Sequence, residues 1–232
     1  MIRQTHLYVV IGVFIALWSG ISAVLHYAGF IANNTQMSFQ DALWRSFSVA
    51  VLGVFLAIVL FDVWLWRVRW LPRWVVDRPV LGGTWKAELE VTWKDKEGQP
   101  HKKTLDGHMV VYQTYSTVSM RLLTDSSHSR LLASELTAEK DHSYTFGAVY
   151  QATPSTEARD TQDRKIHFGG MWLVCHGRNP DVMEGHFWTD EFSRGTLRLS
   201  RRWSHRHFGS FAAAQAAYAE YEKGLIPAPG AA

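Results

Sequence analysis

The sequence lacks the residue patterns that catalysis and metal binding require. Its 232 residues contain one cysteine, Cys175, so no disulfide can form within the chain. Such a chain fits a reducing compartment, although many exported domains also lack disulfides. There is no glycine-rich phosphate loop, nucleophile elbow or zinc-spaced Cys/His set, and the 11 histidines have no catalytic carboxylate or serine partners in the pattern. We therefore expect no enzyme activity, no metal site and no cofactor.

Charge is also scarce, and it is unevenly placed. The formal net charge is only +3. Residues 1–78 hold six Lys/Arg and three Asp/Glu, whereas residues 79–232 hold 18 of each kind and are neutral. A neutral domain attracts a polyanion poorly, because non-specific nucleic-acid binding is mainly electrostatic. Long DNA or RNA is therefore excluded as an expected partner.

Two long apolar runs are present in the first third of the chain. Residues 7–32 are almost uncharged, and only Asp62 interrupts residues 46–66. Each run supplies roughly 20 apolar residues, which is enough to cross a bilayer as a helix. A core helix of a soluble protein rarely reaches this length without a polar face. We predict a two-helix transmembrane hairpin with a basic juxtamembrane linker over residues 1–78.

Arginines set the predicted orientation of this hairpin. Arg67, Arg69 and Arg73 follow the second run, and the connection 33–44 has no Lys or Arg. The positive-inside rule then places both termini in the cytosol. Small residues at helical spacing would let helix backbones approach closely, either between the two spans or between neighbouring protomers. These small residues are Gly12, Ala16, Gly20, Gly53 and Ala57.

The rest of the chain has the pattern of an all-β domain. Apolar and polar residues alternate from Trp85 to Trp93, as in a half-buried strand, and seven further runs follow at short spacing. These runs are residues 107–113, 116–125, 129–138, 142–152, 165–176, 182–190 and 194–201. Eight antiparallel strands suit a closed barrel that can hold one small ligand, and a two-sheet sandwich is the alternative. We assign the barrel to residues 79–208, and a short helix with a flexible tail to residues 209–232. Ser210 is predicted to cap this helix.

Short motifs in this domain occur in an order that resembles one family. The motifs are Gly83-Thr84-Trp85 in the first strand, Tyr150 with Pro154 at the end of the fifth, His167-Phe168-Gly169 in the sixth, Gly185 to Glu191 in the seventh, and Arg194-Gly195-Thr196-Leu197 in the last. Together with the two apolar runs, they resemble the two-transmembrane, β-strand-rich effectors of bacterial CBASS anti-phage systems. The sequence departs from the family at two positions, with Phe187 in place of a tyrosine and Glu191 in place of an arginine.

The resemblance implies a mechanism and a set of partners. A partner nucleotidyltransferase makes a cyclic oligonucleotide, the cytosolic barrel binds this messenger, and the protein oligomerises. The spans then disrupt the bacterial inner membrane, and the infected cell dies. The implied partners are a cyclic dinucleotide, membrane lipids, further copies of the chain and the messenger synthase.

Strand parity, counted from the motif residues, selects the candidate ligand contacts. A cyclic dinucleotide offers base faces, base edges and two phosphates, so its site needs aromatic rings, hydrogen-bonding side chains and a cation. The inward-facing candidates are Trp85, Gln113, Tyr150, His167, Phe187 and Thr189, and Arg194 near a strand end could contact a phosphate. For each aromatic residue, a place in the barrel core is an equal alternative.

Two other classes of function compete with the messenger receptor. A membrane-tethered barrel could bind a lipid or metabolite as a sensor or scaffold without harming the membrane. A membrane-anchored hydrolase is disfavoured, because the sequence lacks a catalytic constellation.

Overall fold

The structure is a computed structural model, and its chain forms two compact units, Met1–Val76 and Asp77–Ala232. It describes residues 12, 14–16, 18–24, 26–27, 39–68, 70–72, 75–95, 97–162, 165–203 and 207–223.

Most of the described residues of the first unit lie in two helical segments, the first of them within residues 12–27. The second, helix α2, spans Phe39–Val63, and a 3-10 turn, η1, follows over Leu65–Arg67. The buried hydroxyls of Ser22 and Ser46 lie 2.6 Å apart and join the two helical segments. Within the part of the chain that the structure describes, no helix reaches the combination of length and hydropathy that a membrane span requires. The predicted two-span hairpin is therefore not confirmed, and much of the run 7–32 lies outside the described residues.

The predicted small-residue stripe is exposed. Gly12, Ala16 and Gly20 are all exposed, and a Cβ added at Gly12, Gly20 or Gly53 would meet no atom within 4 Å. The contacts described between the two helical segments use other side chains, among them Trp18, whose ring meets that of Phe47 edge to face at 5.6 Å. Whether the stripe packs against another molecule stays a prediction.

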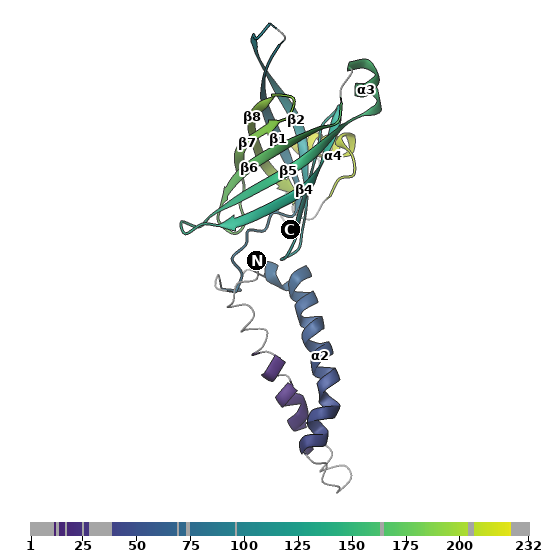
Figure 1. The fold of residues 1–232 in the computed structure, drawn as a ribbon, viewed down its shortest axis with the longest axis vertical. Helices are drawn as coiled ribbons and strands as arrows, with labels where there is room; N and C mark the ends of the chain where they lie inside the picture. The colour runs from purple at the N-terminus through teal and green to yellow at the C-terminus, as the bar shows by residue number, and fades with distance from the viewer. Residues whose placement is uncertain are drawn as a thin grey trace. The chain divides into compact units, whose positions relative to one another are not determined.

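The second unit contains a closed barrel of eight strands, in which each strand pairs with its neighbours in sequence. Figure 1 shows the strands wrapped around one axis. The strands are β1 (Gly83–Lys94), β2 (Pro100–Gln113), β3 (Val118–Leu123), β4 (Ser127–Ala138), β5 (Ser143–Pro154), β6 (His167–His176), β7 (Met183–Thr189) and β8 (Arg194–Trp203). All pairs are antiparallel, including the closing pair of β1 with β8. The predicted eight-stranded barrel is confirmed, and the sandwich alternative is wrong because the sheet closes on itself.

A packed apolar core fills much of the barrel interior. Period-two alternation sends every second side chain inward, and the inward set is large and apolar. Fully buried members include Trp85, Phe146, Leu173, Met183 and Leu199. Burying an aliphatic or aromatic side chain of this kind contributes roughly 1.5–3 kcal/mol. The core thus stabilises the barrel and also occupies space that a ligand would need.

One end of the barrel is closed by the segment that leads into β1. The Gln113 side-chain oxygen accepts hydrogen bonds from the backbone N–H of Leu81, at 2.6 Å, and of Gly82, at 3.2 Å, while its amide donates to the Pro79 carbonyl at 2.8 Å. The Trp85 indole donates to the Leu81 carbonyl at 2.9 Å. We call this end, where β1 begins and β2 finishes, the plugged end.

A β-bulge completes the plugged end. The pairing of β1 with β8 shifts register between Thr84 and Lys86, and on β8 Arg201 has a positive φ of 51°. A bulge adds a residue to one strand and redirects the side chains that follow. Here the Arg202 guanidinium lies 5.2 Å from the Trp85 ring centroid, a cation–π contact on the inner side.

Two helices accompany the barrel. Helix α3 (Thr156–Gln162) connects β5 to β6 at the end opposite the plug, which we call the α3 end. Helix α4 (Phe211–Glu222) follows β8. The backbone N–H of Ala213 donates to the Ser210 hydroxyl at 3.3 Å, so the predicted N-cap is present. Helix α4 packs on the outside of the barrel, where the Tyr218 hydroxyl lies 2.8 Å from the carbonyl oxygens of both Thr84 and Arg201.

Candidate functional site

The strand register brings four of the predicted ligand residues to the α3 end. Tyr150 on β5 pairs with Gly169, which pairs with Thr189 on β7. His167, the first residue of β6, lies two residues closer to the α3 end than Gly169. Phe187 on β7 lies two residues farther from that end than Thr189. All four have inward parity, so they face the same part of the barrel interior.

Tyr150 combines an aromatic face with an available hydroxyl. A Cβ at Gly169 would lie 2.5 Å from the Tyr150 Cζ, so the glycine provides the space in which the ring rests. The hydroxyl is 3.5 Å from the Trp188 carbonyl oxygen, which is long for a hydrogen bond. Burial, with the nearby Asp190 charge, raises the pKa of Tyr150 to about 12. The hydroxyl therefore stays protonated at neutral pH and can donate to a ligand oxygen.

Phe187 and Lys103 lie in one cross-strand row. Phe187 pairs with Gly195, Gly195 with Val91, and Val91 with Lys103 on β2. A Cβ at Gly195 would approach the Phe187 ring at 3.0 Å, so this ring also covers a glycine. Because paired residues share a face of the sheet, Lys103 has the same inward parity as Val91, which packs against the core. The row thus places the exposed Lys103 at the same end of the barrel as Phe187, three strands away from it.

His167 lies beside the turn that connects β7 to β8. Its Nδ1 is 3.8 Å from a carboxylate oxygen of Glu191, and its side chain is 23% exposed. Thr189 is used within the turn: its hydroxyl lies 2.7 Å from that of Ser193, and its N–H donates to the Ser193 carbonyl at 2.9 Å. Thr189 therefore shapes the α3 end, whereas His167 presents a ring that can donate to an anion.

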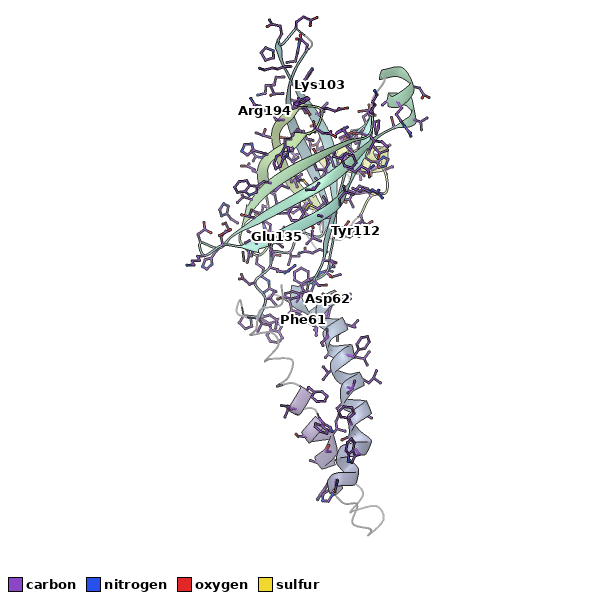
Figure 2. The ribbon with its side chains drawn as sticks, viewed as in Figure 1. Phe61, Asp62, Lys103, Tyr112, Glu135 and Arg194 are labelled. Atoms are coloured by element: carbon purple, nitrogen blue, oxygen red, sulfur yellow. The ribbon has the colours of Figure 1, made fainter. Side chains whose placement is uncertain are left out.

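The structure does not bring the other predicted residues to this group. Trp85 and Gln113 lie at the plugged end, where their polar groups are bonded to the 79–82 segment. Arg194 is exposed and pairs with Trp188 and Thr92, which places it on the outer face of the barrel. Figure 2 shows Arg194 and Lys103 near the same end of the barrel. Of these two cations, only Lys103 has inward parity, and sequence analysis missed it.

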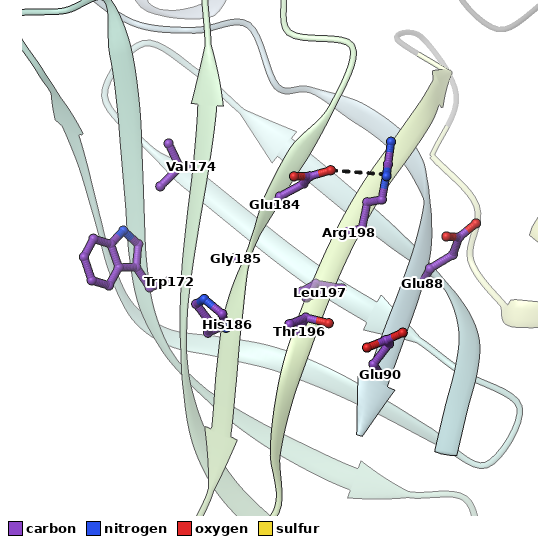
Figure 3. A pocket seen from close by; sticks show the side chains of 10 residues that line it. All are labelled: Glu88, Glu90, Trp172, Val174, Glu184, Gly185, His186, Thr196, Leu197 and Arg198. Atoms are coloured by element: carbon purple, nitrogen blue, oxygen red, sulfur yellow. Dashed lines mark ion pairs between the residues drawn. The ribbon is translucent and has the colours of Figure 1, made fainter. Parts of the chain in front are cut away.

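A groove of about 700 Å³ lies on the outer face of the barrel. Figure 3 shows its lining side chains on β1, β6, β7 and β8. Three carboxylates, those of Glu88, Glu90 and Glu184, line it together with one guanidinium, that of Arg198. The Glu184 carboxylate pairs with Arg198 at 3.3 Å. The groove is large enough for a small ligand, but its excess of carboxylates repels a phosphate.

Comparisons with known proteins bear on the barrel domain. A sequence-family profile described as the Cap15 cyclic dinucleotide receptor domain matches residues 76–201, which is more than half of the chain. No curated protein matches this chain. Among solved structures, the chain is similar to a redesigned β barrel at 14% identity and a TM-score of 0.31, over 53% of this chain and 92% of that one. A similarity this distant carries no information about function.

Proposed function

Because this chain belongs to the family of the Cap15 cyclic dinucleotide receptor domain, an effector family of CBASS anti-phage defence, we propose that it binds its messenger on the inner face of the barrel at the α3 end. The family model describes a receptor domain rather than a catalytic domain. The proposal makes the barrel the sensor that responds to a cyclic dinucleotide during infection.

One observation carries the choice of site. Tyr150, Phe187, His167 and Lys103 share inward parity and lie towards one end of the barrel. The plugged end is closed by buried, hydrogen-bonded groups, and the outer groove is rich in carboxylates. A ligand with two phosphates and two bases needs rings and cations, and the inward parity of these residues at the α3 end supports this choice.

We assign each of the four side chains a separate role. Tyr150, which is only partly buried, offers a stacking surface, and a stacked base contributes roughly 1–3 kcal/mol by alanine substitution. Phe187 is 8% exposed and belongs to the barrel core that supports the site. The Tyr150 hydroxyl donates to a base edge or a phosphate oxygen. Lys103 and His167 pair with the phosphates, and Glu191 beside His167 weakens this attraction.

Calorimetry of the full-length chain against cyclic dinucleotides tests the site. We expect Tyr150→Ala and Lys103→Ala each to weaken binding about tenfold or more, because each removes a stacking or charged contact. Glu191→Gln should strengthen binding, because it removes a negative charge near the phosphates.

Arg121→Ala is the matched control, since Arg121 lies on β3 and bonds outward to the Gly209 carbonyl. Binding that is unchanged in Tyr150→Ala and Lys103→Ala would contradict this site. A folded chain that binds no cyclic dinucleotide would contradict the messenger receptor and favour a lipid or metabolite ligand.

The membrane step is also part of this proposal. We propose that messenger binding to the cytosolic barrel favours an assembly of several copies. The helical units of this assembly then disrupt the inner membrane. Support comes from the apolar runs 7–32 and 46–66 and from the arginines that follow them. A ligand can drive assembly only if it binds the assembled state more tightly than the separate copies.

A further inference from the structure

Four large apolar side chains form a continuous patch on the outside of the barrel. Phe168 is 46% exposed, Trp172 54% and Trp188 55%, and Val149 on β5 is 49% exposed. We call this set the aromatic face. Scattered exposed apolar residues are common, but a contiguous patch marks an interaction site.

The register shows that the four residues are neighbours. Val149 pairs with Gly170 on β6, and Gly170 pairs with Trp188 on β7. A Cβ at Gly170 would overlap the Trp188 indole, so this ring lies across the glycine. Phe168 and Trp172 stand two residues to either side of Gly170 on the same face. The aromatic face therefore spans β5, β6 and β7 without interruption.

The aromatic face continues into the outer groove of Figure 3. Trp172 belongs to both, and it pairs with His186, which also lines the groove. Glu184 and Arg198 are cross-strand partners on β7 and β8, and their side chains are 59% and 57% exposed. The surface thus places an apolar area beside one acidic and one basic group that are both accessible.

We propose that the aromatic face and the adjoining groove form a two-fold interface between barrels, occupied by a second copy of this chain. This inference rests on the proposed function, because it names the surface through which messenger-bound copies assemble. In a two-fold interface the same patch meets itself, and each Glu184 then contacts the partner's Arg198. The adjacent pair of opposite charges is suited to this exchange.

Area and charge favour a second copy over other occupants. Three half-exposed aromatic side chains leave on the order of 300 Å² of aromatic surface on each barrel, and the mainly apolar groove extends this surface, so the face corresponds to the central part of an interface of ~800 Å² per partner. Glu88, Glu90 and Glu184 line the groove against Arg198, and Lys102 pairs with Glu90 at 2.8 Å, so the groove keeps a small acidic excess. This balance opposes anionic lipid headgroups and the messenger itself, but a second copy supplies both charges.

Charge reversal tests the interface directly. Sedimentation of the full-length chain in mild detergent is measured over a concentration series, alone and with cyclic di-AMP or cyclic di-GMP. Glu184→Arg and Arg198→Glu should each weaken self-association at least about tenfold. In either variant, two pairs of like charges face each other across the two-fold axis. An equimolar mixture of the two variants should restore association, because the arginine introduced at position 184 of one copy then faces the glutamate introduced at position 198 of the other.

The controls separate this effect from folding and from messenger binding. Both side chains are more than half exposed, so the pair within one barrel contributes little to stability, and melting temperatures should be unchanged. Lys140→Glu, at an exposed position in the β4–β5 turn outside the patch, is the control reversal and should leave association intact. A wild-type chain that stays monomeric, single variants that associate normally, or a mixture that is not restored would each overturn the interface. Calorimetry reports messenger binding independently, so its failure would count against the proposed function alone.

Discussion

At the residue scale, the Gln113 side chain makes three of the hydrogen bonds that close the plugged end. It is 6% exposed and bonds to three backbone groups of the segment leading into β1. A buried polar group stabilises a fold only when its hydrogen bonds are made, and an unpaired partner costs about 1–3 kcal/mol. Gln113 is therefore explained by structure, although its inward parity had also suggested a ligand contact.

We expect Gln113→Leu to destabilise the barrel by roughly 2–4 kcal/mol, because the variant leaves the Leu81 N–H and the Pro79 carbonyl without partners. Tryptophan fluorescence during chemical unfolding measures the loss. Gln151→Leu is the control, since Gln151 bonds only to the exposed Arg130 among the described residues. Equal losses in both variants would show that the plug is not held by this side chain.

At the scale of elements, helix α4 is joined to the barrel by an aromatic cluster around His108. The His108 ring is 1% exposed, lies 4.9 Å from the Tyr218 ring, and contacts Gln215 of α4 at 3.0 Å through Nε2. Burial lowers the pKa of His108, and Lys86 acts in the same direction, while Gln215 and Asp106 oppose it. Protonation of His108 therefore opposes the docking of α4.

This predicts a loss of stability in mild acid. The unfolded chain binds a proton at His108 near its ordinary pKa of about 6.5, whereas the folded chain does so only at lower pH. Stability is therefore complete above about pH 6.5 and falls as the pH drops toward the folded value, by at most about 1.4 kcal/mol per pH unit. Melting curves from pH 8 to pH 5 should show this slope, and His108→Gln should reduce it. An unchanged slope in the variant would assign the acid sensitivity to other groups.

At the scale of the whole molecule, sensing and output are assigned to different units. The barrel holds the candidate messenger site, and the helical unit carries the apolar runs. Under the proposed function, two helices cannot enclose an aqueous path by themselves, so membrane damage would require several copies. The exposed small residues Gly12, Ala16 and Gly20 are suited to close contact between helices of different copies.

We expect Gly20→Leu to leave messenger binding intact and to reduce membrane damage several-fold, because the added side chain separates the helices. Dye uptake is measured in cells that also express a messenger-producing nucleotidyltransferase. Ser19→Leu, which adds similar bulk at an exposed neighbouring position, is the control. Normal uptake in Gly20→Leu would exclude this contact surface. Absent uptake in wild-type cells whose messenger demonstrably binds would contradict the effector proposal.

The sequence by itself determined the elements whose cause is local. Alternation of apolar and polar residues located the eight strands, and Ser210 located the start of the last helix, because both signals depend on neighbours along the chain. The first half of β2 was missed, since residues 100–106 show little alternation and become a strand only by pairing with β1. Lys103 was missed for the same reason.

Only the tertiary structure decided which inward residues meet. Gln113 and Tyr150 both have inward parity, yet they lie toward opposite ends of the barrel. The row of Phe187, Gly195, Val91 and Lys103 and the outer groove each combine strands that are far apart in sequence. Parity is a property of one strand, whereas register and closure arise between strands, and no local pattern contains that information.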